Sequence, residues 1–242
     1  MGLKESMPHK LKTVIIGGSS GMGLCLAQKL YALGHEIVIA SRSKDKLGKA
    51  VKTIGKAESY VLDVTKEKEV IQFFQAVGPF DHLVTSASDF VMGSFLNMPL
   101  DQAKGFFDSK FWGQYTAAKY GAPHLRTGGS ITFFCGMAGQ KPFIHFSAGS
   151  AINAALEGLT RALALELSPL RVNAISPGTI VTPVWNVMSE KERLREFEET
   201  AQKLPVKRVG QPEDIAQAAI YLIQCGFATG SVVYVDGGGR IA

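Results

Sequence analysis

Residues 13–23 read T-V-I-I-G-G-S-S-G-M-G, and the rest of the chain is organised around this stretch. The three apolar β-branched residues 14–16 predict a short buried strand. A glycine-rich turn follows and leads into residues 24–30, whose apolar side chains recur at helical spacing. A helix N-terminus offers free N–H groups and a partial positive charge to a pyrophosphate, and glycines let the backbone approach it. We therefore expect a dinucleotide site, with an ordinary glycine-rich turn as the alternative.

The composition is that of a globular chain with a large core. Of 242 residues, 46% are hydrophobic and 19% are charged, and the net charge is +5. No dense run of Lys and Arg with interleaved aromatic residues predicts a nucleic-acid surface. No apolar run approaches the ~18 residues of a membrane span, and the N-terminus carries no apolar signal core.

The three cysteines are Cys25, Cys135 and Cys225, which lie far apart in the sequence. An odd number of distant cysteines favours reduced thiols over a disulfide framework or a metal site. We therefore expect a cytoplasmic protein with no metal, no nucleic-acid partner and no membrane association.

Strand and helix signals alternate along the chain. Besides the first strand, short apolar runs predict strands at residues 37–40, 60–62, 80–85, 130–135, 171–175 and 231–235. Helical periodicity predicts helices at residues 66–77, 99–125, 148–167, 189–204 and 212–225. This alternation is typical of an α/β, Rossmann-type doubly wound parallel sheet, here of seven strands with helices on both faces. Because no linker or composition break interrupts it, we expect residues 1–242 to form a single domain.

Polar residues and glycines collect where the predicted strands end. The carboxyl ends of parallel strands share one edge of the sheet, and ligands bind there where the strand order reverses. The predicted cofactor contacts at this edge are Gly17, Ser19, Ser20, Gly21, Met22, Gly23, Ser41, Arg42, Ser43, Asp63, Val64, Ser86, Ala87, Ser88, Pro177, Gly178 and Thr179.

Arg42 indicates which dinucleotide binds. It follows the second strand, about 20 residues after the glycines, where an acidic residue would bind the ribose 2′-hydroxyl of NAD. An Arg at this place accommodates a 2′-phosphate through its charge and its bidentate fork. Because no Asp or Glu stands at the strand end, we expect NADP(H) to be preferred over NAD(H). A solvated basic turn that opens a helix is the alternative.

On these motifs, nearly the whole chain resembles the short-chain dehydrogenase/reductase family. Residues 16–23 match its T-G-x-x-x-G-x-G motif, with Ile in place of Thr, and residues 63–64 match its adenine-contacting Asp-Val. Residues 171–178 with Thr182 match its sixth-strand motif, and residues 210–216 and 236–238 match its C-terminal signature. The resemblance implies an NADP(H)-dependent oxidoreductase acting on a carbonyl or alcohol substrate. It adds to the cofactor contacts Ile180 and Thr182.

The chain departs from the family at the catalytic positions. The family uses a Tyr as proton donor, a Lys four residues later, a Ser that polarises the carbonyl, and an Asn in the preceding long helix. By register, the Tyr, Lys, Ser and Asn positions hold, in that order, Gly149, Asn153, Gly136 and Lys110. An alternative register places Phe146 and Ser150 at the Tyr and Lys positions, which again supplies neither residue.

Lys110 and His145 are the candidate replacements for the missing acid. A Lys110 that faces the nicotinamide could polarise a carbonyl or donate a proton, with its pKa lowered by burial. The alternative is a lysine on the surface. His145 lies in the loop before the second long helix, and the ordinary pKa of histidine suits acid–base work. A merely exposed loop histidine is the alternative there. Asn153 can still bind a ribose hydroxyl, as a cofactor contact at a catalytic position.

Residues 183–205 occupy the place of the family's lid. Trp185 and Met188 could close an apolar pocket over a ligand, which favours a small apolar substrate. The family's usual assembly implies a homodimer or homotetramer through the two long helices.

Three functions stay open at this point. The first is a redox enzyme with a non-standard active site, which ranks first because the cofactor half is complete. The second is a catalytically silent NADP-binding sensor or assembly protein. The third is a non-redox enzyme, such as a lyase or isomerase, since a fold does not determine its chemistry.

Overall fold

The computed structural model describes residues 10–87 and 89–242. Its strands are β1 (Lys12–Ile16), β2 (Glu36–Ser41), β3 (Glu58–Val61), β4 (Phe80–Thr85), β5 (Leu125–Phe134), β6 (Arg171–Pro177) and β7 (Val232–Val235). Its α-helices are α1 (Gly21–Ala32), α2 (Lys44–Ile54), α3 (Glu67–Val77), α4 (Leu100–Phe106), α5 (Gly113–Gly121), α6 (Ser147–Glu166), α7 (Glu190–Lys203) and α8 (Pro212–Gln224).

The strands form one seven-stranded sheet in the order β3-β2-β1-β4-β5-β6-β7, and every neighbouring pair is parallel. The order reverses between β1 and β4, which places the ligand-binding edge at the ends of these two strands. The doubly wound Rossmann-type fold expected from the sequence is therefore confirmed.

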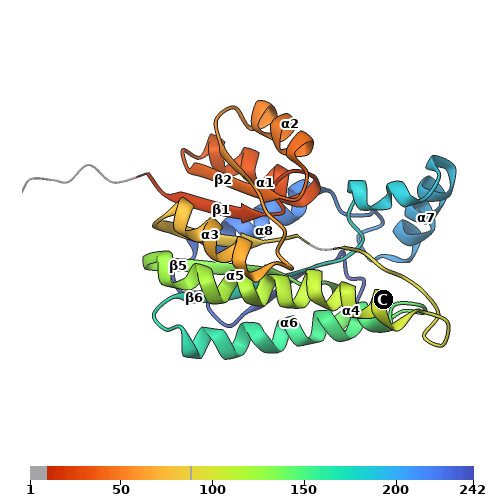
Figure 1. Cartoon of the computed structure of the whole chain (residues 1–242). Coiled ribbons are helices and arrows are strands. Elements are labelled where there is room, and N and C mark those ends of the chain that lie inside the picture. Colours follow the sequence, from red (N-terminus) through yellow and green to blue (C-terminus); the bar gives the residue numbers. More distant parts are fainter. Residues whose placement is uncertain (1–9, 88) are drawn as a thin grey trace, which may run out of the picture.

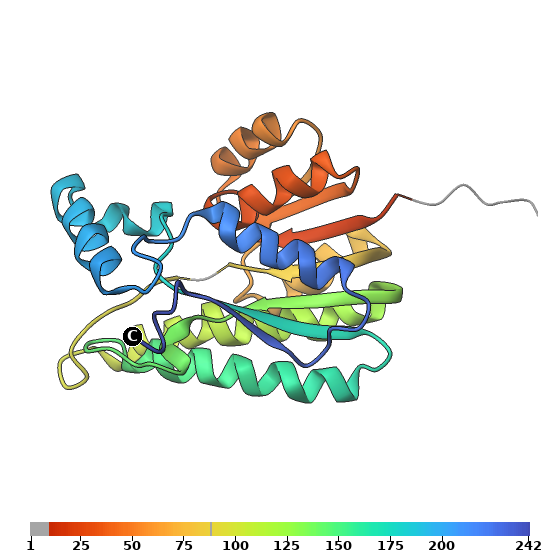
Figure 2. The same ribbon diagram turned by 180° about the vertical axis from the view of Figure 1, so that it is seen from behind.

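Helices cover both faces of the sheet. Figure 1 shows α3, α5 and α6 on one face, and Figure 2 shows α1 and α8 on the other. Along β1 the side chains alternate between the two cores: Val14 and Ile16 pack with the α3, α5 and α6 side, whereas Ile15 packs with the α1 and α8 side. Because both faces are buried, the strand is continuously apolar rather than alternating.

The long helix expected at residues 99–125 is in fact several segments. After α4, residues Phe107–Trp112 form a π-helical segment, η1, and α5 follows it. A short 3₁₀ turn, Ala122–His124, then ends the helix, and β5 begins at Leu125 instead of residue 130. Pro123 explains the end, because proline has no N–H for the helix and clashes with the preceding turn. The π-helical segment contains Lys110, and such segments often occur at functional sites.

One helix of the structure was not predicted from the sequence. This helix, α2, follows Arg42 and buries Leu47, Ala50 and Ile54 against the sheet. The charged helix α7 buries no residue and lies apart from the two helical layers, as Figure 1 shows. Of the described helices, none has the length and apolarity that crossing a membrane would require.

Candidate active site

A cavity of about 1050 Å³ opens at the carboxyl ends of the strands. Its lining includes every predicted cofactor contact that the structure describes, while Ser88 lies outside the described residues. These lining residues are Gly17, Ser19, Ser20, Gly21, Met22, Gly23, Ser41, Arg42, Ser43, Asp63, Val64, Ser86, Ala87, Asn153, Pro177, Gly178, Thr179, Ile180 and Thr182. The topology thus brings together residues from six separate stretches of the chain.

The turn between β1 and α1 is shaped to admit a phosphate group. Gly17 has a φ of +94°, and a Cβ built on it would lie 2.6 Å from the backbone nitrogen of Ala87. A Cβ on Gly23 would lie 2.4 Å from the carbonyl oxygen of Gly17. Among the described residues, no side chain caps the N-terminus of α1, whose N-cap is Ser20. Its first N–H groups therefore remain available to a pyrophosphate, as a nicotinamide dinucleotide requires.

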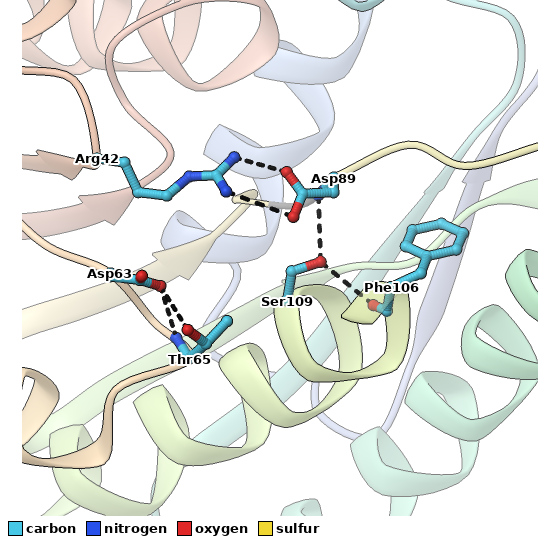
Figure 3. Close-up of polar contacts among 6 residues, drawn as sticks. All are labelled: Arg42, Asp63, Thr65, Asp89, Phe106 and Ser109. Atoms are coloured by element: carbon cyan, nitrogen blue, oxygen red, sulfur yellow. Dashed lines mark hydrogen bonds and ion pairs between the residues drawn. The ribbon is translucent and has the colours of Figure 1, made fainter. Parts of the chain in front are cut away.

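Arg42 and Asp89 form an ion pair in the lining of this cavity. The Nη2 atom of Arg42 lies 2.6 Å from Oδ1 of Asp89, and Nη1 lies 3.4 Å from Oδ2. Figure 3 shows the guanidinium facing the carboxylate, with Asp63 nearby bound to Thr65. The sequence analysis missed Asp89, because it lies 47 residues from Arg42 and no local pattern links them.

Lys110 is half-buried and lines the cavity. Its Nζ donates a hydrogen bond to the carbonyl oxygen of Cys135 at 3.4 Å. Burial lowers the pKa of Lys110 from 10.5 to about 8, since an apolar environment disfavours the charged form. A lysine with this pKa holds a proton at neutral pH and releases it more readily than a surface lysine, so it can act as a general acid.

Asn153 is buried on the first half of α6, beside the strand end. A Cβ built on Gly136 would lie 3.1 Å from its Nδ2 atom. Its Oδ1 atom has no hydrogen-bond partner within the described part of the chain. An unpaired buried acceptor in a ligand cavity suits a hydroxyl donor such as that of a ribose.

The space beside Gly149, the position that the first register predicts for the tyrosine, is filled by the ring of Phe146. Gly149 is buried in α6, and a Cβ built on it would lie 2.2 Å from the ring of Phe146. Phe146 is only 4% exposed and stacks on Phe143 with ring centroids 4.7 Å apart. Phe90 packs against the same ring at 5.3 Å. An apolar wall therefore stands where either register would look for a phenol hydroxyl.

His145 and Lys110 are not brought together. His145 is exposed, has a φ of +68°, and is not among the residues that line the cavity. Its backbone oxygen accepts a hydrogen bond from Gly93, which ties two loops to each other. Of the two candidate acids, only Lys110 lines the cavity.

The segment at residues 183–205 borders the cavity and consists of a 3₁₀ turn, Pro183–Val187, followed by α7. Trp185 donates from Nε1 to the carbonyl oxygen of Ile180 at 2.9 Å and packs on Phe90 and Phe197. Met188 lines the cavity as well. These contacts anchor the segment over an apolar, largely aromatic part of the cavity.

Comparison with known proteins identifies the family. A family model described as enoyl-(acyl carrier protein) reductase matches residues 17–239. The short-chain dehydrogenase/reductase ATR9 of Stachybotrys chlorohalonatus is 33% identical, over 93% of this chain and 95% of that protein. The chain belongs to the short-chain dehydrogenase/reductase family. Carbonyl reductase family member 4 of Danio rerio is another relative, 29% identical over 93% of this chain and 96% of its own length.

Solved structures of short-chain dehydrogenases share the fold. A small-chain dehydrogenase crystallised in complex with NADPH is 37% identical, with a TM-score of 0.86 over 97% of this chain and 100% of that chain. A reductase/Diels-Alderase, MalC of Malbranchea aurantiaca, is 26% identical with a TM-score of 0.89, over 97% of both chains. This is a family of oxidoreductases that bind a nicotinamide cofactor, and the cavity described above fits one.

Proposed function

We propose that this protein is an NADP(H)-dependent oxidoreductase that interconverts an apolar carbonyl compound and its alcohol, with Lys110 as the proton donor. The observation that carries the proposal is that Lys110, with a pKa lowered to about 8, lines the cofactor cavity. Lys110 offers an acidic proton in a site whose tyrosine position is a glycine.

The chain's own residues would hold the dinucleotide at three places. The first-turn N–H groups of α1 would bind the pyrophosphate, and Arg42 would bind the 2′-phosphate. Oδ1 of Asn153 would accept a hydrogen bond from a ribose hydroxyl. When bound and reduced, the cofactor supplies a hydride to the carbonyl carbon of the substrate.

Lys110 would complete the reduction. As the carbonyl carbon gains the hydride, the ammonium of Lys110 transfers a proton to the carbonyl oxygen, which gives the alcohol and a neutral amine. The carbonyl oxygen of Cys135 holds Nζ in place during this transfer. Water returns the proton to the amine before the next cycle, and in the oxidative direction Lys110 accepts the proton instead.

The aromatic wall favours an apolar substrate. Phe90, Phe143, Phe146, Trp185 and Met188 line one part of the cavity. In such a pocket the apolar side chains bind the body of an apolar ligand, and the few polar groups determine the orientation of the ligand. Lys110 would then select the carbonyl oxygen as the end of the substrate that enters deepest.

The first test separates cofactor binding from chemistry. Calorimetric titration should show NADPH binding at least several-fold more tightly than NADH, with this preference lost in Arg42→Asp. A panel of apolar ketones and aldehydes should give NADPH oxidation in the wild type and a loss of at least about 100-fold in Lys110→Met, since a general acid contributes about 10²–10⁴-fold. Lys110→Met should still bind NADPH, and the exposed Lys104→Met serves as the matched control.

Loss of all four family residues favours a second candidate, an NADP-binding sensor without redox activity. Tight NADPH binding with no turnover on the whole panel would select it. The third candidate, a non-redox enzyme on this fold, draws support from the relative named as a reductase/Diels-Alderase. Product formation without any change of NADPH absorbance would select that one.

We further propose that residues 1–242 act as one domain, in the cytoplasm, and assemble as a homodimer or homotetramer. The helical faces of η1–α5 and α6 would form the interface. Trp112 and Tyr115 are 50% and 37% exposed on that side, which is unusual for aromatic residues on a free surface. Sedimentation of the wild type and of Trp112→Glu tests this, and a wild-type monomer would refute it.

A further inference from the structure

The residue proposed to bind the 2′-phosphate already faces a carboxylate. Two nitrogens of the Arg42 guanidinium meet the two oxygens of Asp89, at 2.6 and 3.4 Å. Both residues line the cavity, one just after β2 and the other in the segment after β4 (Figure 3). A fork-to-fork pair of this kind uses the donor geometry that would also grip a phosphate.

We propose that Asp89 is a second determinant of cofactor specificity. Its carboxylate competes with the 2′-phosphate of NADP(H) for Arg42 and so reduces the preference for NADP(H) over NAD(H) that Arg42 creates. This inference rests on the proposed role of Arg42. A 2′-phosphate must take donors from Asp89 or lie beside its negative charge, and either event costs binding free energy. NAD(H), which lacks that phosphate, binds without this loss of free energy, and its 2′-hydroxyl can donate a hydrogen bond to the carboxylate of Asp89.

Asp89 is held in place independently of Arg42. Its backbone nitrogen donates to Oγ of Ser109 at 3.4 Å, and that hydroxyl donates to the carbonyl oxygen of Phe106 at 3.3 Å. Ser109 is buried in the π-helical segment. These contacts hold the backbone of Asp89, so its side chain remains within reach of Arg42 and of a phosphate bound there.

The pair is partly exposed, so the expected effect is moderate. The side chain of Arg42 is 61% exposed and that of Asp89 is 40% exposed. Exposed ion pairs contribute little free energy, and breaking one changes an equilibrium constant by about three- to fivefold. The effect should shrink at high salt, because mobile ions screen exposed charges.

The test uses nucleotides that differ only in the 2′-phosphate. Calorimetry would measure binding of adenosine 2′,5′-bisphosphate, AMP, NADPH and NADH to the wild type and to Asp89→Asn. We expect Asp89→Asn to bind NADPH and the bisphosphate about three- to fivefold more tightly, with AMP and NADH unchanged or weaker. Asp108→Asn is the matched control, since it removes the same charge from an exposed position outside the cavity lining.

The outcomes separate this inference from the proposed cofactor preference. If Asp89→Asn weakens NADPH binding, the carboxylate orients Arg42 for the phosphate and the competition is refuted. An equal gain for AMP and the bisphosphate would also refute it. If Arg42→Ala leaves NADPH binding unchanged, the proposed preference itself fails. In the double variant Arg42→Ala/Asp89→Asn, the gain from Asp89→Asn should become smaller than in the single variant, because the competition for Arg42 is removed and only direct charge repulsion is left.

Discussion

The ring of Phe146 occupies the space that a side chain on Gly149 would fill, 2.2 Å from the position of its Cβ. The absence of a tyrosine at 149 is therefore built into the packing of the site. Phe146 in turn packs on Phe90, Phe106 and Phe143, so its ring cannot simply turn away. Restoring the family's tyrosine at 149 would require a rearrangement of this cluster.

Gly149→Ala should destabilise the protein by about 1–3 kcal/mol, because it overpacks the core against Phe146. Gly158→Ala is the matched control on the same helix, where a Cβ would meet no atom within 4 Å. That change should leave stability unchanged or raise it by up to ~1 kcal/mol, since Ala favours a helix over Gly. Urea unfolding measures both. In Phe146→Leu/Gly149→Ala the cost should be smaller than the sum of the single changes, and strict additivity would contradict the contact.

Lys110→Met should raise stability at pH 7 and lose this advantage as the pH rises. Burial lowers the pKa of Lys110 from 10.5 to about 8 in the folded state. Between those values the unfolded chain binds a proton that the folded chain does not, so the stability of the wild type rises with pH there. The full difference corresponds to roughly 3 kcal/mol below pH 8. Urea unfolding at pH 7 and pH 10 measures it, and a gap between the two proteins that does not change with pH would contradict the burial of the charge.

His82→Gln should make the protein less sensitive to mild acid. Burial, with a further contribution from His35, lowers the pKa of His82 from 6.5 to about 4. The stabilising effect of a neutral His82 is present above pH 6.5 and is lost as the pH falls toward 4, because only the unfolded chain gains the proton. Between pH 7 and pH 5 the variant should lose roughly 2 kcal/mol less than the wild type. Urea unfolding at pH 7 and pH 5 measures this difference, and an equal loss in the two proteins would contradict the burial of His82.

Only one of the three thiols should react rapidly with an alkylating reagent at neutral pH. Burial raises the pKa of Cys25 and of Cys135 to about 11, so both stay protonated. A hydrogen bond from the backbone at Phe227 lowers the pKa of Cys225, which is partly exposed. Mass spectrometry after brief iodoacetamide treatment should find the label on Cys225 and none in Cys225→Ser. Equally fast labelling of Cys135 would show that the strand end is open to solvent.

The sheet and the cofactor turn could be predicted from the sequence because their signals are local. Residues 14–16 are buried on both faces, so the strand shows up as a continuous apolar run, and the glycines of the next turn are required by close backbone contacts. The strand ends could be grouped in advance as well, since parallel strands present their carboxyl ends at one edge. Pro123, which ends the long helix, was also visible in the sequence, although the helix was predicted to continue to residue 125.

Local sequence patterns could not predict which distant side chains contact each other. Asp89 meets Arg42 from 47 residues away, through a loop whose path depends on the packing of β4 and the π-helical segment. The burial of Lys110 depends on the turn of that same segment, which helical periodicity treats as an ordinary α-helix. Local sequence patterns were thus enough to predict the fold and the edge of the sheet at which the cofactor cavity lies. Backbone hydrogen bonding and burial repeat at a fixed spacing along the chain, so they leave a pattern in the sequence. Whether Lys110 lines the cavity, and what the guanidinium of Arg42 faces, depend on contacts between distant side chains that only the folded chain creates.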